Sequence, residues 1–340
     1  MAREAPSSSL VLQSSPFLKR ETTTPGLMRE VMLAVLPVVG VAVWFFGLSA
    51  ILLLAAATAG ALGTEYLLTP ARPRGASLRD GSAVLTGLLL GLTLPPTMPL
   101  WMAFVGGAAG VGLGKLAFGG LGHNLFNPAL VGRAFLQAAF PTAITSWAAP
   151  GGPTTLFRSN FALPLMSAPQ EAIDAVSTAT PLGLMKFEQT ATQTGHLLLG
   201  SIPGSLGETA AVVILLCGLF LVLRRTMDWR IPAAIVLSVA VFSVIPWAVA
   251  EGYPSPWMMI SSGGLLFGAV YMATDPVTSP TAPLGAWVFG IGVGAIVVLI
   301  RLWGGLPEGV MYAILLMNAA TPLIERACQP RGFGRGRAAA

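Results

Sequence analysis

The stretch Gly87-Leu-Leu-Leu-Gly91 recurs as Gly264-Leu-Leu-Phe-Gly268, 177 residues further along the chain. Glu30 and Glu208 are separated by nearly the same interval, each at the opening of one half of the sequence. Each short match is weak evidence alone, but the common spacing indicates an internal repeat. Paired repeats whose apolar segments are short and interrupted by Gly or Pro are typical of membrane proteins with a site between two halves.

The composition predicts an integral membrane protein. Hydrophobic residues make up 54% of the 340 residues and charged residues 10%, whereas soluble domains have about 25% charged residues. The first 26 residues are polar and contain no apolar run, so we expect no cleaved signal peptide. The basic residues lie in short loops, where they set membrane topology, and we expect no nucleic-acid partner. Cys217 and Cys328 are too far apart to suggest a metal site or a disulfide framework.

The apolar runs divide into ten segments, five on each side of a polar interval. We expect a hinge at Gly47 and breaks at Pro95-Pro96 and Asp275-Pro276, which leave half-helices. Because five segments is an odd number, the two halves must have opposite orientations. The predicted fold is an all-α integral membrane protein with ten transmembrane segments, arranged as two inverted five-helix repeats with broken half-helices. The segments are residues 31–46, 48–68, 81–94, 100–118 and 127–140, then 207–223, 231–250, 258–274, 284–303 and 309–326.

The distribution of basic residues predicts the orientation. With the N-terminus inside, fifteen of the nineteen Lys and Arg residues fall on the inner side, and only Arg158, Lys186 and Arg301 fall outside. This asymmetry favours two cytoplasmic termini in a membrane-embedded bundle surrounded by lipid. The predicted divisions are a cytoplasmic arm (1–30), a first repeat (31–140), an outer-face region (141–204), a second repeat (205–327) and a cytoplasmic tail (328–340).

Several ionisable residues lie in or at the ends of apolar segments. Buried charges in a membrane usually pair or line a cavity. We expect Lys115 and Glu325 to reach the membrane interface with their long side chains. Glu208 and Asp275 have no basic neighbour within ten positions. They either line a cation path or lie at the membrane interface at segment ends without a role in transport. Glu30 is a third candidate for the cation path.

Two asparagines bracket the start of a predicted half-helix. Asn127 precedes Pro128, which fits a helix N-cap followed by proline at the first helical position. An N-cap role does not exclude ligand binding by Asn127. The N-terminus of a half-helix in a membrane protein presents free N–H groups to a polar ligand. Asn124 lies close enough to join the same site.

The polar interval contains the hydroxyl-rich stretch Asp174-Ala-Val-Ser-Thr-Ala-Thr-Pro181. Pro181 restricts Thr180 to an extended backbone, which we expect to turn its side chain outward. These residues alone fit an ordinary surface turn. They also fit a site where a threonine hydroxyl carries a covalently attached group, and the charge distribution predicts that Thr180 faces the outer side.

Four motifs together resemble the RnfD/NqrB family, the flavin-carrying membrane subunits of Rnf complexes and of sodium-pumping NADH:quinone reductases. They are Pro95-Pro-Thr-Met-Pro-Leu-Trp101, the glycine- and asparagine-rich stretch from Gly119 to Arg133, Met272-Ala-Thr-Asp-Pro276, and the stretch from Asp174 to Pro181. The resemblance covers about residues 15–327. It implies a fold similar to that of urea transporters, in agreement with the repeat.

The resemblance also implies the cofactors and their sites. Thr180 would carry FMN through a phosphoester, attached by a flavin transferase outside the cytoplasm, with Asp174 and Ser177 in the same motif. Asn124 and Asn127 match positions that contact a noncovalent riboflavin. The chain departs from the family at Thr178, where the motif has glycine, and at Phe17, where many relatives have histidine. Thr178 therefore offers a second hydroxyl that competes with Thr180 as the attachment point of the flavin.

The implied function is a membrane component of an ion-translocating electron-transport complex in the bacterial inner membrane, inactive without its partner subunits. Its length favours the RnfD branch, although the asparagine motif with Arg133 also resembles NqrB. The main alternative is a solute channel or transporter on the same fold, since fold does not decide function. A third possible function is that of a membrane anchor for soluble redox partners. The motifs do not distinguish Na⁺ from H⁺.

Overall fold

In the computed structural model, helices joined by turns and loops make up the residues that it describes. These are 23–69, 75, 77–164, 180–188, 190, 195, 197, 200, 202–208, 210–249 and 252–329. No β-strand occurs among them, so the expectation of an all-helical chain is confirmed. Most of the predicted N-terminal arm, most of the C-terminal tail, and the residues Phe17, Asp174, Ser177 and Thr178 lie outside the described residues.

The helices follow the predicted apolar segments closely. The first half contains α1 (Thr24–Leu68), α2 (Ser82–Leu92), α3 (Leu100–Gly114) and α4 (Pro128–Ala139), with α5 (Pro141–Ile144) after it. The second half contains α9 (Ala211–Leu223), α10 (Arg230–Val249), α11 (Pro256–Ser261), α12 (Leu265–Phe267), α13 (Pro283–Trp303) and α14 (Val310–Cys328). Short helical pieces fill the remainder: η1 (Ser77–Asp80), η2 (Leu116–Phe118), η3 (Arg158–Phe161), α7 (Pro181–Gly183), η4 (Leu184–Glu188) and η5 (Gly268–Met272).

Helix α1 is a hairpin of two helices that turns at Gly47, as the sequence predicts. Gly47 has φ 64° and ψ −143°, which favours glycine, and a Cβ there would lie 2.5 Å from the backbone N of Thr155. The two ends of α1 converge on α2. Near the start of α1, Met28 lies next to Gly81, the residue before α2: a Cβ on Gly81 would lie 3.8 Å from the Met28 Cβ. Near the end of α1, Glu65 is linked to Ser82, the first residue of α2, because Lys115 Nζ donates to both side chains. In a straight helix, residues 28 and 65 would be about 55 Å apart.

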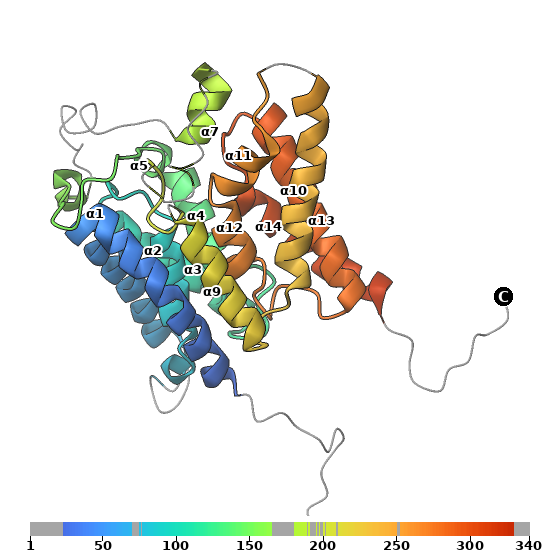
Figure 1. The fold of residues 1–340 in the computed structure, drawn as a ribbon. Helices are drawn as coiled ribbons and strands as arrows, with labels where there is room; N and C mark the ends of the chain where they lie inside the picture. The colour runs from blue at the N-terminus through green and yellow to red at the C-terminus, as the bar shows by residue number, and fades with distance from the viewer. Residues whose placement is uncertain are drawn as a thin grey trace, which may run out of the picture.

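The two halves lie side by side (Figure 1). Helices α1 to α4 form one group and α10 to α14 the other, with α9 at the front against α1. Hydrogen bonds join the halves where α2 ends, from Gly207 N to Leu92 O (2.7 Å) and from Leu206 N to Leu94 O (3.1 Å). The Tyr271 hydroxyl also donates to Ala34 O at 2.8 Å. One apolar core runs through both groups.

The described helices have the character of a multi-pass membrane protein. Four are long and apolar enough to cross a membrane: Thr24–Leu68, Leu100–Phe118, Arg230–Val249 and Pro283–Trp303. Two shorter apolar helices are Ser82–Leu92 and Ala211–Leu223. Large apolar side chains face outward on several helices, including Leu36, Leu216, Ile245 and Leu323. Exposed apolar surface on this scale fits contact with lipid.

Candidate functional site: two polar pockets

Two largely apolar pockets, each with a few polar groups in its wall, lie where helices of the two halves meet. The first, here called the asparagine pocket, is lined by Asn124, Asn127, Lys115 and Asp275. The second, here called the arginine pocket, is lined by Arg133, Gln137, Glu208 and Glu308. Their empty volumes, which include the open mouths, are about 720 and 710 Å³.

The asparagine pocket brings together three residues that the sequence singled out. Asn127 is the N-cap of α4, and its Oδ1 accepts from Ala129 N at 3.0 Å and from Leu130 N at 3.4 Å. Its Nδ2 donates to Met272 O at 3.2 Å, which ties α4 to η5. The predicted N-cap role of Asn127 is confirmed. Asp275, which follows η5, lines the same cavity.

Asn124 shapes the loop before α4. Its Oδ1 accepts from Gly122 N, and its Nδ2 donates to Phe126 O, both at 3.3 Å. Both asparagine side chains therefore bind backbone groups. Asn127 keeps one free N–H for a ligand, and Asn124 keeps one N–H and one acceptor site. With Asn318 oriented to satisfy its neighbours, its side-chain oxygen accepts from Asn127 N at 3.2 Å. Asn318 of α14 thus touches Asn127 directly.

Lys115 corrects one expectation from the sequence. It does not reach the membrane interface; it is 3% exposed at the wall of the asparagine pocket. Its Nζ donates to both oxygens of Glu65 at 2.8 Å and to Ser82 Oγ at 2.6 Å. The hairpin of α1 brings Glu65 to the end of α3, and sequence patterns could not show this pairing. Glu325, also expected at the interface, is half-buried and accepts from Thr281 N and Oγ1.

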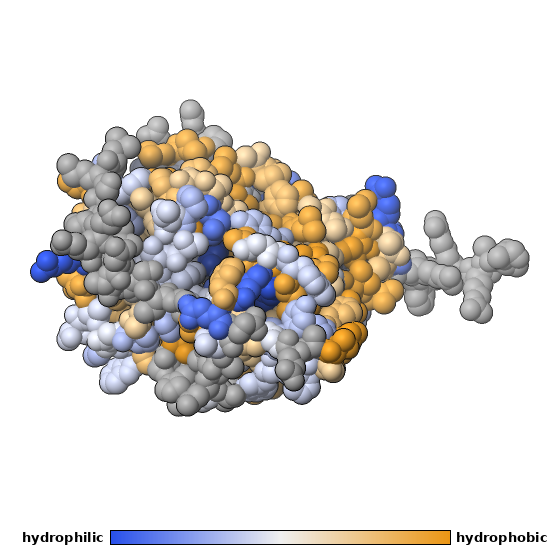
Figure 2. Space-filling view, turned by 90° about the horizontal axis from the view of Figure 1, so that it is seen from above, coloured by the Kyte–Doolittle hydropathy of each residue, from blue (hydrophilic) through white to orange (hydrophobic). Residues whose placement is uncertain are grey.

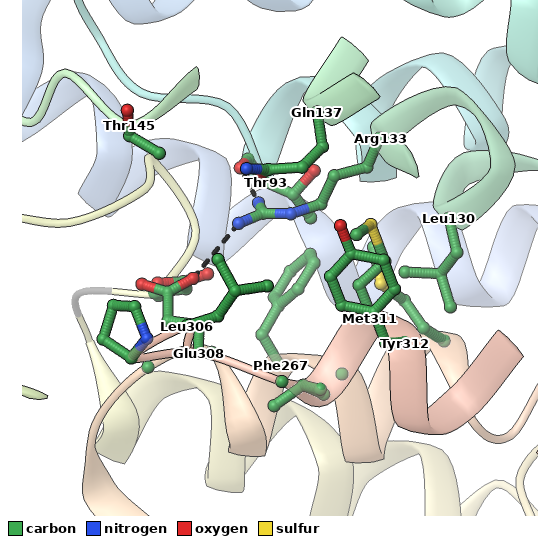
Figure 3. Close-up of a pocket in the computed structure, with 18 of the residues that line it drawn as sticks. Thr93, Leu130, Arg133, Gln137, Thr145, Phe267, Leu306, Glu308, Met311 and Tyr312 are labelled. Carbon is green, nitrogen blue, oxygen red and sulfur yellow. Dashed lines mark hydrogen bonds and ion pairs between the residues drawn. The ribbon is translucent and has the colours of Figure 1, made fainter. Parts of the chain in front are cut away.

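The arginine pocket contains an ion pair between the halves (Figure 3). Arg133 of α4 points across the cavity to Glu308, with 3.2 Å between Nη2 and Oε2, and it also donates to Thr93 O. Glu308 lies in the loop between α13 and α14. Burial, together with the charge of Glu208, raises the pKa of Glu308 above its ordinary value. Sequence reasoning gave Glu308 no role, because nothing around it in the sequence resembles a motif.

Glu308 Oε1 is a buried atom without a hydrogen-bond partner in the described part of the chain. Leu130, Phe267, Met311 and Tyr312 add apolar and aromatic walls to the same cavity. Figure 2 shows a hollow with strongly hydrophilic residues near the middle of the face seen from above. An apolar cavity with a few convergent polar groups is the usual form of a small-molecule site.

Thr180 lies beside the arginine pocket. Its backbone is extended (φ −68°, ψ 156°), as Pro181 requires, but its side chain is buried at 5% exposure rather than turned outward. Thr180 Oγ1 accepts from Gly183 N at 3.2 Å and caps α7. Leu182 packs against Gly263, which lines the arginine pocket: a Cβ on Gly263 would lie 2.4 Å from Leu182 Cδ1.

Two cationic side chains, those of Lys186 and Arg301, hold the segment after Thr180 against α13 and the residues before α12. Lys186 Nζ donates to Arg301 O (2.9 Å) and Leu306 O (3.1 Å) at the end of α13, and burial lowers its pKa. The Arg301 guanidinium donates to Met259 O, Ser262 O and Gly263 O. Both side chains line a smaller neighbouring pocket with Leu182. The segment after Thr180 is thereby fastened to the second half.

The remaining predicted residues are distributed between the pockets. Glu208 lines the arginine pocket, and Asp275 the asparagine pocket. Glu30 lies apart from both and pairs with Arg224, with 2.6 Å between Oε1 and Nη2. The structure therefore does not bring the three acidic candidates into one cluster. No group of three metal-ligating side chains occurs among the described residues.

Residues 11–334 match the model of the NQR2, RnfD, RnfE family. The chain belongs to this family. It is 38% identical to the D subunits of the proton-translocating ferredoxin:NAD(+) oxidoreductase complex of Clostridium ljungdahlii and of the Na(+)-translocating complex of Acetobacterium woodii, over 96% of this chain and of each relative. The D subunit of the ion-translocating oxidoreductase complex of Stutzerimonas stutzeri is 41% identical over 91% of this chain and 92% of its own. These family relatives confirm the resemblance found in the motifs.

Proposed function

We propose that this chain is the D subunit of an ion-translocating ferredoxin:NAD⁺ oxidoreductase complex of the Rnf type. Near-complete coverage by relatives of that name carries the proposal. The chain would act only with the other subunits, in a bacterial inner membrane with both termini cytoplasmic. The relatives include one named for protons and one named for Na⁺, so both ions stay open.

The proposal includes ten membrane segments in two inverted repeats. The described helices supply five on each side once α1 is counted as two and α11, α12 and η5 as one broken helix. Lys115 follows α3 and donates to Ser82, the first residue of α2. Arg301 at the end of α13 donates to the carbonyls just before α12. This correspondence supports the repeat.

The proposal also includes two flavins. FMN would be linked by a phosphoester to Thr180, attached by a flavin transferase on the outer face, with Asp174 and Ser177 in the same motif. Riboflavin would occupy the asparagine pocket near Asn124 and Asn127, whose amides can offer both donors and acceptors to its ring. The flavins supply redox chemistry, and the chain supplies position and electrostatics. Glu208, Asp275 and Glu30 are the proposed residues of the cation path.

Because Thr180 is buried as a helix cap, its hydroxyl must be presented to the transferase before the segment packs or while it opens. The test is fluorescence of the denatured protein band after co-expression with a flavin transferase. We expect a fluorescent wild-type band and a dark Thr180→Ala band. Thr178→Ala is the matched control and keeps the fluorescence. A dark wild-type band, with the transferase shown to be active on another substrate, would favour a channel or an anchor instead.

A further inference from the structure

The arginine pocket has a hydrogen-bonding pattern that a flavin ring would complete. The pyrimidine edge of an isoalloxazine ring presents one N–H donor between two carbonyl acceptors. Glu308 Oε1 is a buried acceptor without a partner among the described residues. Arg133 lies against the other oxygen of the same carboxylate and offers donors, and Gln137 adds an amide on the same side (Figure 3). The pocket therefore offers one free acceptor and several neighbouring donors, the kinds of group that this edge needs.

The rest of the cavity suits a flat aromatic ring. Its apolar walls include Leu130, Phe267, Met311 and Tyr312. The cavity opens on one side, so a flat ring could enter it without a rearrangement of these walls. A small solute or a bare ion would leave these apolar walls without a partner, whereas a heterocycle would cover them.

Thr180 is close enough to deliver such a ring. Leu182 touches the pocket wall at Gly263, and Thr180 precedes it by two residues. A separation of two residues spans at most about 7 Å. Lys186 fastens the following segment to the end of α13 by donating to several carbonyls there, so Thr180 is held beside the cavity.

We propose that the arginine pocket receives the isoalloxazine ring of the FMN carried by Thr180, with the Arg133–Glu308 pair against the edge of the ring. This inference rests on the proposed function, since it needs a flavin on Thr180. It assigns roles to Arg133 and Glu308 as residues that set the reduction potential of that flavin. Reduction adds electron density to the ring, which a carboxylate disfavours and a guanidinium favours.

The experiment is a spectroelectrochemical titration of the full chain in its complex, after co-expression with the flavin transferase. Each flavin gives a redox wave in the titration, and the wave that disappears in Thr180→Ala belongs to the covalent flavin. We expect Glu308→Gln to shift that wave to more positive potential and Arg133→Gln to more negative potential. Arg133→Lys, which keeps the charge, should shift it less. A merely structural role would not give shifts of opposite sign.

Glu325→Gln is the matched control. It removes one carboxylate from the far end of α14, about 22 Å along the helix axis from Val310, which follows Glu308 by two residues, and should leave the covalent wave in place. Unchanged potentials in both pocket variants, shifts of the same sign, or shifts confined to the flavin that persists in Thr180→Ala would overturn the assignment. A wild-type chain without any covalent flavin would instead contradict the proposed function, and the inference would fall with it.

Discussion

The asparagine pocket and the arginine pocket hold buried charges in different ways. At the asparagine pocket, Lys115 has three donors and three acceptor atoms within 2.8 Å, supplied by Glu65 and Ser82. At the arginine pocket, Arg133 reaches one oxygen of Glu308, and the other oxygen has no partner among the described residues. The first arrangement is closed and stabilises the fold. The second leaves hydrogen-bonding capacity directed at a ligand.

The largest expected effect comes from breaking the closed arrangement. Lys115→Met leaves the fully buried Glu65 without its cation, and loss of one partner from a buried pair costs about 3–5 kcal/mol. We expect a large drop in the unfolding temperature of the detergent-solubilised chain. The double variant with Glu65→Leu should recover most of it, because no charge is left unpaired. Equal losses in the single and double variants would show that the pair is not what stabilises this region.

A smaller effect is expected at the open arrangement. Arg133→Gln removes the ion pair with Glu308, whose side chain is 17% exposed. Solvent can reach part of that carboxylate, so we expect about 1–3 kcal/mol, the range for an unsatisfied buried group. Chemical unfolding in mixed micelles would measure it. A loss as large as that of Lys115→Met would contradict the distinction between the pockets.

The open arrangement also predicts a dependence on pH. The folded-state pKa of Glu308 is raised, so the folded chain holds this proton more tightly than the unfolded chain. The contribution of Glu308 to stability is therefore fully present below the ordinary carboxyl pKa of 4.5 and is lost as the pH rises through the folded-state pKa of about 7. Glu308→Gln should flatten this part of the profile. A wild-type profile that rises over the same window would contradict the assignment.

Asn127→Ala tests whether the asparagine pocket depends on its cap. The change removes the side-chain acceptor for Ala129 N and Leu130 N and the bond to Met272 O. Loss of an N-cap costs about 0.5–2 kcal/mol. We expect a moderate loss of stability and loss of the noncovalent flavin from the purified chain. Asn127→Asp keeps the acceptor for Ala129 N and Leu130 N but loses the donor to Met272 O, so comparison of the two variants separates the cap from the bond to Met272.

The smallest effect is expected outside both pockets. Arg224 and Glu30 pair at 2.6 Å, but their side chains are 57% and 26% exposed. Exposed pairs contribute about 0.2–1 kcal/mol, so Arg224→Gln should barely change the unfolding temperature. A change comparable to that of Asn127→Ala would show that this pair fastens α1 to α9 more firmly than its exposure implies.

The sequence predicted what depends on local patterns. Apolar runs located the helices, Gly47 the hinge, and Asn127-Pro128 the N-cap, because each follows from neighbouring residues. It could not predict contacts made by the tertiary fold. Lys115 meets Glu65 only because α1 doubles back, and Arg133 meets Glu308 across 175 positions. The burial of Thr180 depends on how its segment packs on the second half.

We propose that the chain carries two flavins, held in two different ways. Precipitation of the purified chain with acid separates them, because a phosphoester-linked flavin stays with the denatured protein and a noncovalent one is released. The account predicts about one flavin in the pellet and one in the supernatant per chain. It further predicts that Thr180→Ala empties the pellet only. A wild-type pellet free of flavin, from protein matured with an active transferase, would contradict it.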